Sequence, residues 1–159
     1  MKKFLLLFWT ILLSPMLISQ ENPEIIHIDI EGFEPGMTMT YNDFVVKFGK
    51  PDIYRSYETE FGLDEEYEIG DNLFHFEENG VFHNFSIGDN KFRVLTYYIK
   101  EGVRVGDEFS KLDRFKPRFE SDCDNGLSQY VLFDKISDDK LIVFVKNEKI
   151  ISMIYNYPV

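Results

Sequence analysis

The sequence predicts an α+β fold of two tandem units, each a short helix followed by an antiparallel β-meander, with the helices packed on one face of the sheet. Three observations lead to this prediction. Aromatic residues make up 16% of the chain, and aromatic side chains favour strands. Two consecutive hairpin patterns lie in the middle of the chain. The same glycine-to-proline spacing brackets a predicted helix twice.

The N-terminus has the pattern of a cleavable export signal. Lys2 and Lys3 supply a positive start, and residues 4–13 are apolar except for Thr10. An uncleaved membrane anchor is the alternative, but a spanning helix needs about 20 predominantly apolar residues. We therefore predict a signal peptide over 1–20.

The rest of the chain, 21–159, is predicted to be a single mature domain, exported to the periplasm or secreted. No cysteine lies near the expected cleavage point, so we expect no lipid anchor of the bacterial lipoprotein type. The only cysteine, Cys123, cannot form a disulfide within the chain. Packing must therefore stabilise the domain.

Charge narrows the classes of partner. The full chain has a formal net charge of −11, and loss of Lys2 and Lys3 makes the mature protein more negative still. Such a surface repels nucleic acid and anionic membranes. A basic protein partner and a merely solvated acidic face both fit this charge.

The first predicted unit begins with a strand over 25–30, which is rich in β-branched residues. Thr40 is the expected N-cap of a helix that extends to Phe48, because Phe44 and Phe48 are four residues apart. Gly49 and Pro51 are expected to end this helix. Five strands are then predicted, at 53–61, 65–69, 73–77, 81–87 and 91–99.

The second unit starts after Gly102. A short helix is predicted from Gly106 to about Pro117, with Phe109 and Leu112 three residues apart. Strands are predicted at 129–133, 140–146 and 149–155.

The two units are interpreted as an internal repeat, about 33–100 and 101–159. Gly36 to Pro51 and Gly102 to Pro117 have the same spacing, and each pair brackets a helix. We assign architectural roles to the residues of this motif, namely the tight turn, the helix cap and the helix stop. They are Gly36, Thr40, Gly49, Pro51, Gly102 and Pro117.

These residues carry a family resemblance. Gly36-Met37-Thr38, with Phe48-Gly49-Lys50-Pro51-Asp52, resembles the opening of small outer-membrane assembly lipoproteins of the SmpA/OmlA type. Two such units in tandem resemble the β-lactamase inhibitory protein. The resemblance implies short helices on one face of an antiparallel sheet, and in the inhibitor the concave sheet face binds a partner enzyme. The chain lacks both the lipoproteins' anchoring cysteine and the inhibitor's paired cysteines.

Candidate metal and nucleophile sites are weak. The chain has three histidines, His27, His75 and His83. The last two could form a metal site with Glu77 if they shared one face of the sheet. Histidines exposed on strands are the simpler interpretation. Asp122, Asp124, Asn125 and Gly126 partly match a calcium loop, yet the glycine comes one position early and no glutamate closes the loop. Cys123 lies between two aspartates, which disfavour its thiolate. We expect no metal, no cofactor and no catalytic residue set.

Two functions stay open. The favoured one is a non-enzymatic protein-binding module of unknown partner, inhibitor-like or associated with the cell envelope. Tyrosine suits binding surfaces, and the candidate contacts are Tyr57, Tyr67, Tyr97 and Tyr98. An acidic cluster could also meet a basic partner; it comprises Glu58, Glu60, Asp64, Glu65, Glu66 and Glu68. The alternative is a small carboxylate-dependent hydrolase of the cell envelope, in which Glu66 and Glu77 would meet in a cleft.

Overall fold

The computed structural model describes residues 27–133 and 139–156, and the structural statements that follow concern these residues. The predicted signal segment 1–20 lies outside them. No helix in the described part of the chain has the length and apolar character needed to cross a membrane.

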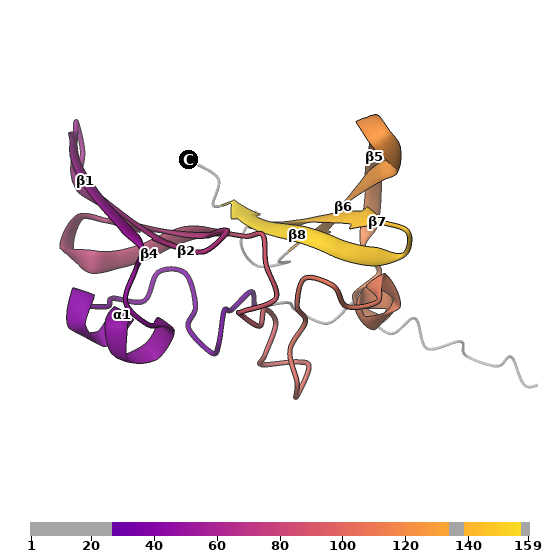
Figure 1. Cartoon of the computed structure of the whole chain (residues 1–159), viewed down its shortest axis with the longest axis horizontal. Coiled ribbons are helices and arrows are strands. Elements are labelled where there is room, and N and C mark those ends of the chain that lie inside the picture. The colour runs from indigo at the N-terminus through magenta and orange to yellow at the C-terminus, as the bar shows by residue number, and fades with distance from the viewer. Residues whose placement is uncertain (1–26, 134–138, 157–159) are drawn as a thin grey trace, which may run out of the picture.

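Eight strands form one antiparallel sheet in the order β1-β2-β3-β4-β8-β7-β6-β5. β4 and β8 therefore meet in the middle, and β1 and β5 form the two edges. In Figure 1 both edges of the sheet turn toward the same side, away from the helix, so that face is concave. The strands are β1 (Ile53–Thr59), β2 (Gly62–Ile69), β3 (Asn72–Glu77), β4 (Val81–Ile87), β5 (Arg118–Cys123), β6 (Leu127–Phe133), β7 (Lys140–Lys146) and β8 (Lys149–Asn156).

The first helix confirms its sequence prediction. α1 (Tyr41–Phe48) begins at a capping box, in which the backbone N–H of Asp43 donates to the Thr40 hydroxyl at 3.2 Å and the Thr40 N–H donates to the Asp43 carboxylate. It ends at Gly49, whose φ of 100° favours glycine and whose N–H donates to the Val45 carbonyl. The buried Pro51 then leads into β1.

Aromatic rings form the core between α1 and the first half of the sheet. The Phe44 ring is fully buried, and its centroid lies 4.5 Å from Tyr67, 5.2 Å from Phe74 and 5.8 Å from Phe76. Phe48 packs beside it, 5.0 Å from Phe74. The core thus lies on one face of the sheet, which is also the side of the connection from β4 to β5 (Figure 1).

The predicted α+β class with two helix units is wrong. The described residues form a single eight-stranded antiparallel sheet with one short α-helix, so the fold is mostly β. The segment expected to be the second helix forms a 3₁₀ helix, η2 (Phe109–Phe115). Phe109, Leu112 and Phe115 are spaced by three, which is the period of a 3₁₀ helix. In α1 the spacing of four between Phe44 and Phe48 suits the α-helix instead.

The motif residues of the second half also occupy turns. Gly102 has a φ of 61°, and a Cβ there would come within 2.7 Å of Arg93 Cβ. Pro117 follows Lys116, which adopts the left-handed conformation at the end of η2. In the first half, Gly36 has a φ of 86° and donates its N–H to the Phe82 carbonyl at 2.7 Å.

The strand predicted at 91–99 is absent, because a buried aspartate redirects the chain. Only Val94 forms bridges, and Leu95 has a φ of 59°. Asp29, 1% exposed, accepts hydrogen bonds from the Thr96 hydroxyl and the Tyr97 N–H. The backbone donors of this segment are therefore used in turns.

The other strand predictions have mixed outcomes. The predictions at 53–61, 65–69, 73–77, 81–87, 129–133, 140–146 and 149–155 are confirmed as β1 to β4 and β6 to β8. The leading strand predicted at 25–30 is wrong over its described part, because only Ile30 forms a bridge there. β5 is an edge strand of mostly polar residues, and it was missed.

Candidate protein-binding surface

Strand register defines the face of the sheet that turns away from α1. Residues directly opposite one another in antiparallel strands point to the same side. Arg55 lies opposite Glu66, which lies opposite His75, which lies opposite Asn84. The neighbouring Phe74 and Phe76 are buried on the α1 side, so this row belongs to the other face. We call it the open face, because no described helix or connection covers it in Figure 1.

The first half of the open face carries charged side chains that are joined by ion pairs and a hydrogen bond. Arg55 forms ion pairs with Glu66, at 3.4 Å, and with Glu68. The Tyr57 hydroxyl donates to Glu66 at 3.0 Å. Burial and this hydrogen bond raise the pKa of Tyr57 above its usual range. Exposed pairs of this kind add little stability, but here they hold four side chains in a defined arrangement on the surface.

The second half of the open face has an apolar centre. Val131 lies opposite Ile142, and Ile142 lies opposite Ile154. Ile142, Ile154 and the neighbouring Phe144 are all only partly buried. A charged area and an apolar area therefore lie side by side across the centre of one concave face.

The four candidate tyrosines do not form one surface. Tyr57, 40% exposed, lies on the open face. Tyr67 is only 2% exposed and points to the other side, where its ring contacts Phe44 and Phe76 and its hydroxyl donates to Glu65 at 2.7 Å. Burial and this hydrogen bond raise the pKa of Tyr67 well above its usual range. Tyr67 is therefore a core residue.

Tyr97 and Tyr98 lie together in the connection between β4 and β5, on the α1 side. Tyr97 is 73% exposed, and its ring centroid lies 5.3 Å from that of Tyr98. Tyr98 packs against the core through Phe115 and stacks on His27. The structure therefore separates this pair from Tyr57.

His75 and His83 lie together, but they are not the exposed strand histidines that the sequence favoured: each side chain is only 15% exposed and has a carboxylate partner. His75 and His83 contact one another with centroids 5.5 Å apart. His75 Nε2 lies 3.3 Å from Asp64, and His83 Nδ1 lies 2.8 Å from Glu77. No group of three or more histidine, cysteine or acidic side chains in the described chain is placed to hold a metal ion.

The two carboxylates named for a hydrolase have different partners. Glu66, in β2, contacts Arg55 and Tyr57. Glu77, the last residue of β3, pairs with His83. Each carboxylate therefore has its own partner side chain, and the two do not share one. The structure therefore gives this hydrolase hypothesis no specific support.

A groove of about 710 Å³ lies at one end of the first half of the sheet. It runs between the β1–β2 turn and the 3₁₀ turn η1 (Glu78–Gly80), and we call it the first groove. Apolar and acidic side chains line it, among them Phe61, Val81 and Phe82 together with Asp64, Glu77 and Glu78. Phe61 stands 81% exposed at the hairpin tip.

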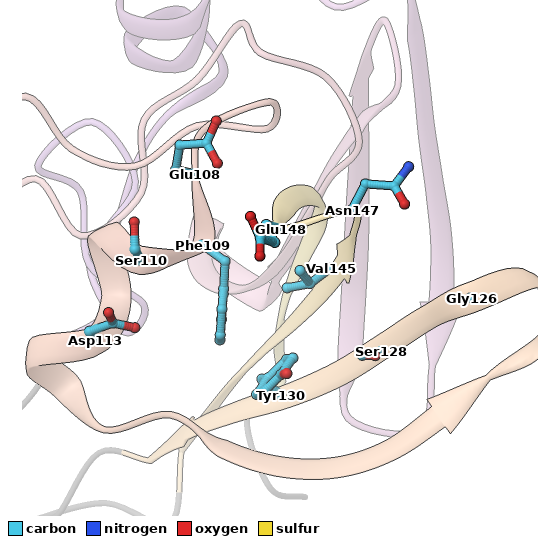
Figure 2. Close-up of a pocket in the computed structure, with 10 residues that line it drawn as sticks. All are labelled: Glu108, Phe109, Ser110, Asp113, Gly126, Ser128, Tyr130, Val145, Asn147 and Glu148. Carbon is cyan, nitrogen blue, oxygen red and sulfur yellow. The ribbon is translucent and has the colours of Figure 1, made fainter.

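A smaller groove of about 380 Å³ has a similar place in the other half, beside the β7–β8 turn. We call it the second groove. Figure 2 shows Phe109 and Tyr130 pointing into it from η2 and β6, and their ring centroids are 4.2 Å apart. Glu108, Asp113 and Glu148 also line it, but Glu108 already forms an ion pair with Lys149 at 3.0 Å.

The segment with the partial calcium-loop pattern is a hairpin turn. η3 (Asp124–Gly126) joins β5 to β6, and Asn125 and Gly126 have positive φ values. Asp122 accepts a hydrogen bond from the Ser128 hydroxyl at 2.8 Å. These residues serve the turn, and Cys123 beside them is a free, partly buried thiol.

Comparisons with known proteins give no relative. No family model matches the chain, and no curated protein or solved structure matches it.

Sequence reasoning missed both grooves. The acidic cluster named from the sequence contributes Asp64 to the first groove, but Phe61 and Glu78 were not singled out. One pattern could have drawn attention to them. Residues 56–90 contain 10 acidic residues and no lysine or arginine, and this segment includes the two turns that form the first groove.

Proposed function

We propose that this chain is an exported, non-enzymatic protein-binding module that uses the open face of its sheet. The observation that carries the proposal is the contrast between the two faces. One face packs against α1 and the connection between β4 and β5. The other is concave, has no described element over it and combines a charged area with an apolar area.

Such a combination suits recognition of another protein. Partly buried Ile142, Phe144 and Ile154 can lose further apolar surface to a partner, which is favourable by about 25 cal/mol per Å². The ordered charges around Arg55 and Glu66 can select among partners. Export is supported by the N-terminal pattern at 1–20, and a freely released form by the lack of a cysteine near it.

Capture from the native cell envelope tests this function. The purified protein, immobilised at low ionic strength, is expected to retain a specific partner. Ser152→Arg places a long charged side chain on the open face, opposite Phe144, and is expected to weaken capture at least tenfold. Asn42→Arg, on the exposed surface of α1, is the matched control and is expected to leave capture unchanged.

Two outcomes would contradict the proposal. Either no protein is retained at any salt concentration, or Asn42→Arg weakens capture as strongly as Ser152→Arg. Thermal melting of each variant checks that both remain folded.

A further inference from the structure

The first groove combines an apolar wall with three acidic side chains, and no lysine or arginine is among the described residues that line it. Phe61 is 81% exposed and lines the same groove as Val81 and the buried Phe82. An exposed aromatic side chain at a hairpin tip, in a groove that also has apolar lining, offers apolar surface that another molecule can cover. Two glutamates and an aspartate lie around the same space.

The Glu78 side chain lies against a glycine of the β1–β2 turn, which has room for it because it lacks a Cβ. Gly62 has a φ of 136°, and a Cβ there would come within 2.9 Å of the Glu78 Cβ. The Glu78 side chain therefore lies across the backbone of the β1–β2 turn, beside Phe61. Among the described residues Glu78 has no cationic partner, whereas Asp64 and Glu77 each contact a histidine.

The surrounding sequence is strongly acidic. Residues 56–90 carry 10 acidic side chains and neither lysine nor arginine, and the adjacent Arg55 pairs with Glu66 and Glu68, which do not line the groove. Residues 101–156 differ, with 11 acidic and 9 basic side chains. In the second groove Lys149 forms an ion pair with Glu108, whereas the described lining of the first groove includes no lysine or arginine. The first groove therefore lies in the more negative half of the chain and, over the described residues, has no lysine or arginine of its own.

We propose that the first groove binds a basic, extended segment of the partner protein, with a lysine or arginine inserted beside Phe61. The stem of the inserted side chain would pack on the Phe61 ring, and a cation over an aromatic ring is attracted to it. Its charged head would meet Glu78, Glu77 and Asp64. This inference rests on the proposed protein-binding function and assigns the chemistry of the partner.

A peptide titration tests the inference without knowledge of the partner. The probe is a capped hexapeptide of alternating lysine and leucine, and its counterpart has glutamate in place of lysine. The amide signals of Phe61 and Asn79 are followed by NMR. The basic peptide is expected to shift both signals and to bind more weakly as salt rises, whereas the acidic peptide leaves them in place.

Matched variants separate the groove from the total charge of the protein. Glu78→Lys is expected to weaken the basic peptide about tenfold, because one carboxylate in direct contact becomes a like charge. Glu148→Lys makes the same change of charge in the β7–β8 turn and is expected to alter affinity less than twofold. Phe61→Ser keeps the charge and is expected to weaken binding about fivefold or more.

The inference is overturned if Glu148→Lys weakens the peptide as much as Glu78→Lys, if Phe61→Ser has no effect, or if the basic peptide does not bind. It is also overturned if spermine binds as tightly as the peptide, since the site would then recognise a small cation. A partner captured equally by wild type, Glu78→Lys and Phe61→Ser would leave the protein-binding function standing and remove only the role of this groove.

Discussion

Replacement of Phe44 by alanine tests whether α1 is held by its aromatic contacts. The Phe44 ring is fully buried and contacts Phe48, Tyr67, Phe74 and Phe76. Removal of a buried phenylalanine ring costs about 3–5 kcal/mol, compared with a total stability of about 5–15 kcal/mol for a typical domain. We therefore expect Phe44→Ala to lose a large share of the free energy of unfolding.

Urea unfolding followed by circular dichroism measures this loss. With a denaturant dependence of about 2 kcal/mol per molar urea, the midpoint should fall by roughly 2 M. Val46→Ala, on the opposite surface of α1 and 87% exposed, should change stability by no more than about 0.5 kcal/mol. If Phe44→Ala does not fold, Phe44→Leu should still show a loss on the order of 1–2 kcal/mol. A loss for Phe44→Ala below about 1 kcal/mol, or equal losses for the two alanine variants, would refute the packing described for α1.

Three further predictions concern polar groups that are buried or partly buried. Burial raises the pKa of Glu31, but hydrogen bonds and the ion pair with Arg93 outweigh burial and leave it below its ordinary value of 4.5. The ionised Glu31 therefore stabilises the fold above pH 4.5, and this contribution is lost as the pH falls. Urea titrations should show that the free energy of unfolding falls less between pH 7 and pH 3 for Glu31→Gln than for wild type. Equal losses in the two proteins would contradict the role of this ion pair. Asp29→Ala removes the acceptor for the Gly32 N–H, the Thr96 hydroxyl and the Tyr97 N–H. Calorimetry should show that this variant is destabilised by about 2–4 kcal/mol, and that Asp29→Asn, which keeps a side-chain oxygen, is destabilised less. Because the pKa of Tyr67 is raised, its neutral hydroxyl contributes fully to stability below the ordinary value of 10.0, and this contribution is lost at higher pH. The free energy of unfolding of Tyr67→Phe should therefore fall less above pH 10.0 than that of wild type. Identical alkaline profiles of the two proteins would count against the buried position of this hydroxyl.

Local patterns predicted the elements that local contacts determine. Thr40 and Gly49 specify both ends of α1 through bonds within a few residues, and the two turns around Gly70 and Gly80 specify the hairpins of the first half. Elements that depend on distant residues were not predictable in this way. The segment 91–99 has a strand-like composition, yet Asp29, far away in sequence, binds its backbone.

The fold class was wrong for a related reason. Apolar residues recur every three positions in 109–115, and this pattern was interpreted as a helix of the α+β fold. An interval of three fits a 3₁₀ helix equally well or better. β5 was missed because an edge strand needs few apolar residues, and Arg118, Glu120 and Asp122 gave no strand pattern.

The candidate surface was predictable only in part. Tyr57 was named from residue type and lies on the open face, whereas Tyr67, chosen by the same criterion, is buried. Strand register decides between these two positions, because a shift of one residue exchanges the faces. Register here depends on pairing along the whole sheet, which residue type does not reveal. The grooves depend on turns that approach one another only after the strands have paired.

Methyl NMR of the complex with the captured partner tests the binding face most directly. Ile142 and Ile154 carry methyl groups on the open face, and Val46 carries them on the exposed side of α1. We expect partner binding to shift the methyl signals of both isoleucines and to leave those of Val46 in place. Shifts at Val46, with both isoleucines unchanged, would contradict binding by the open face.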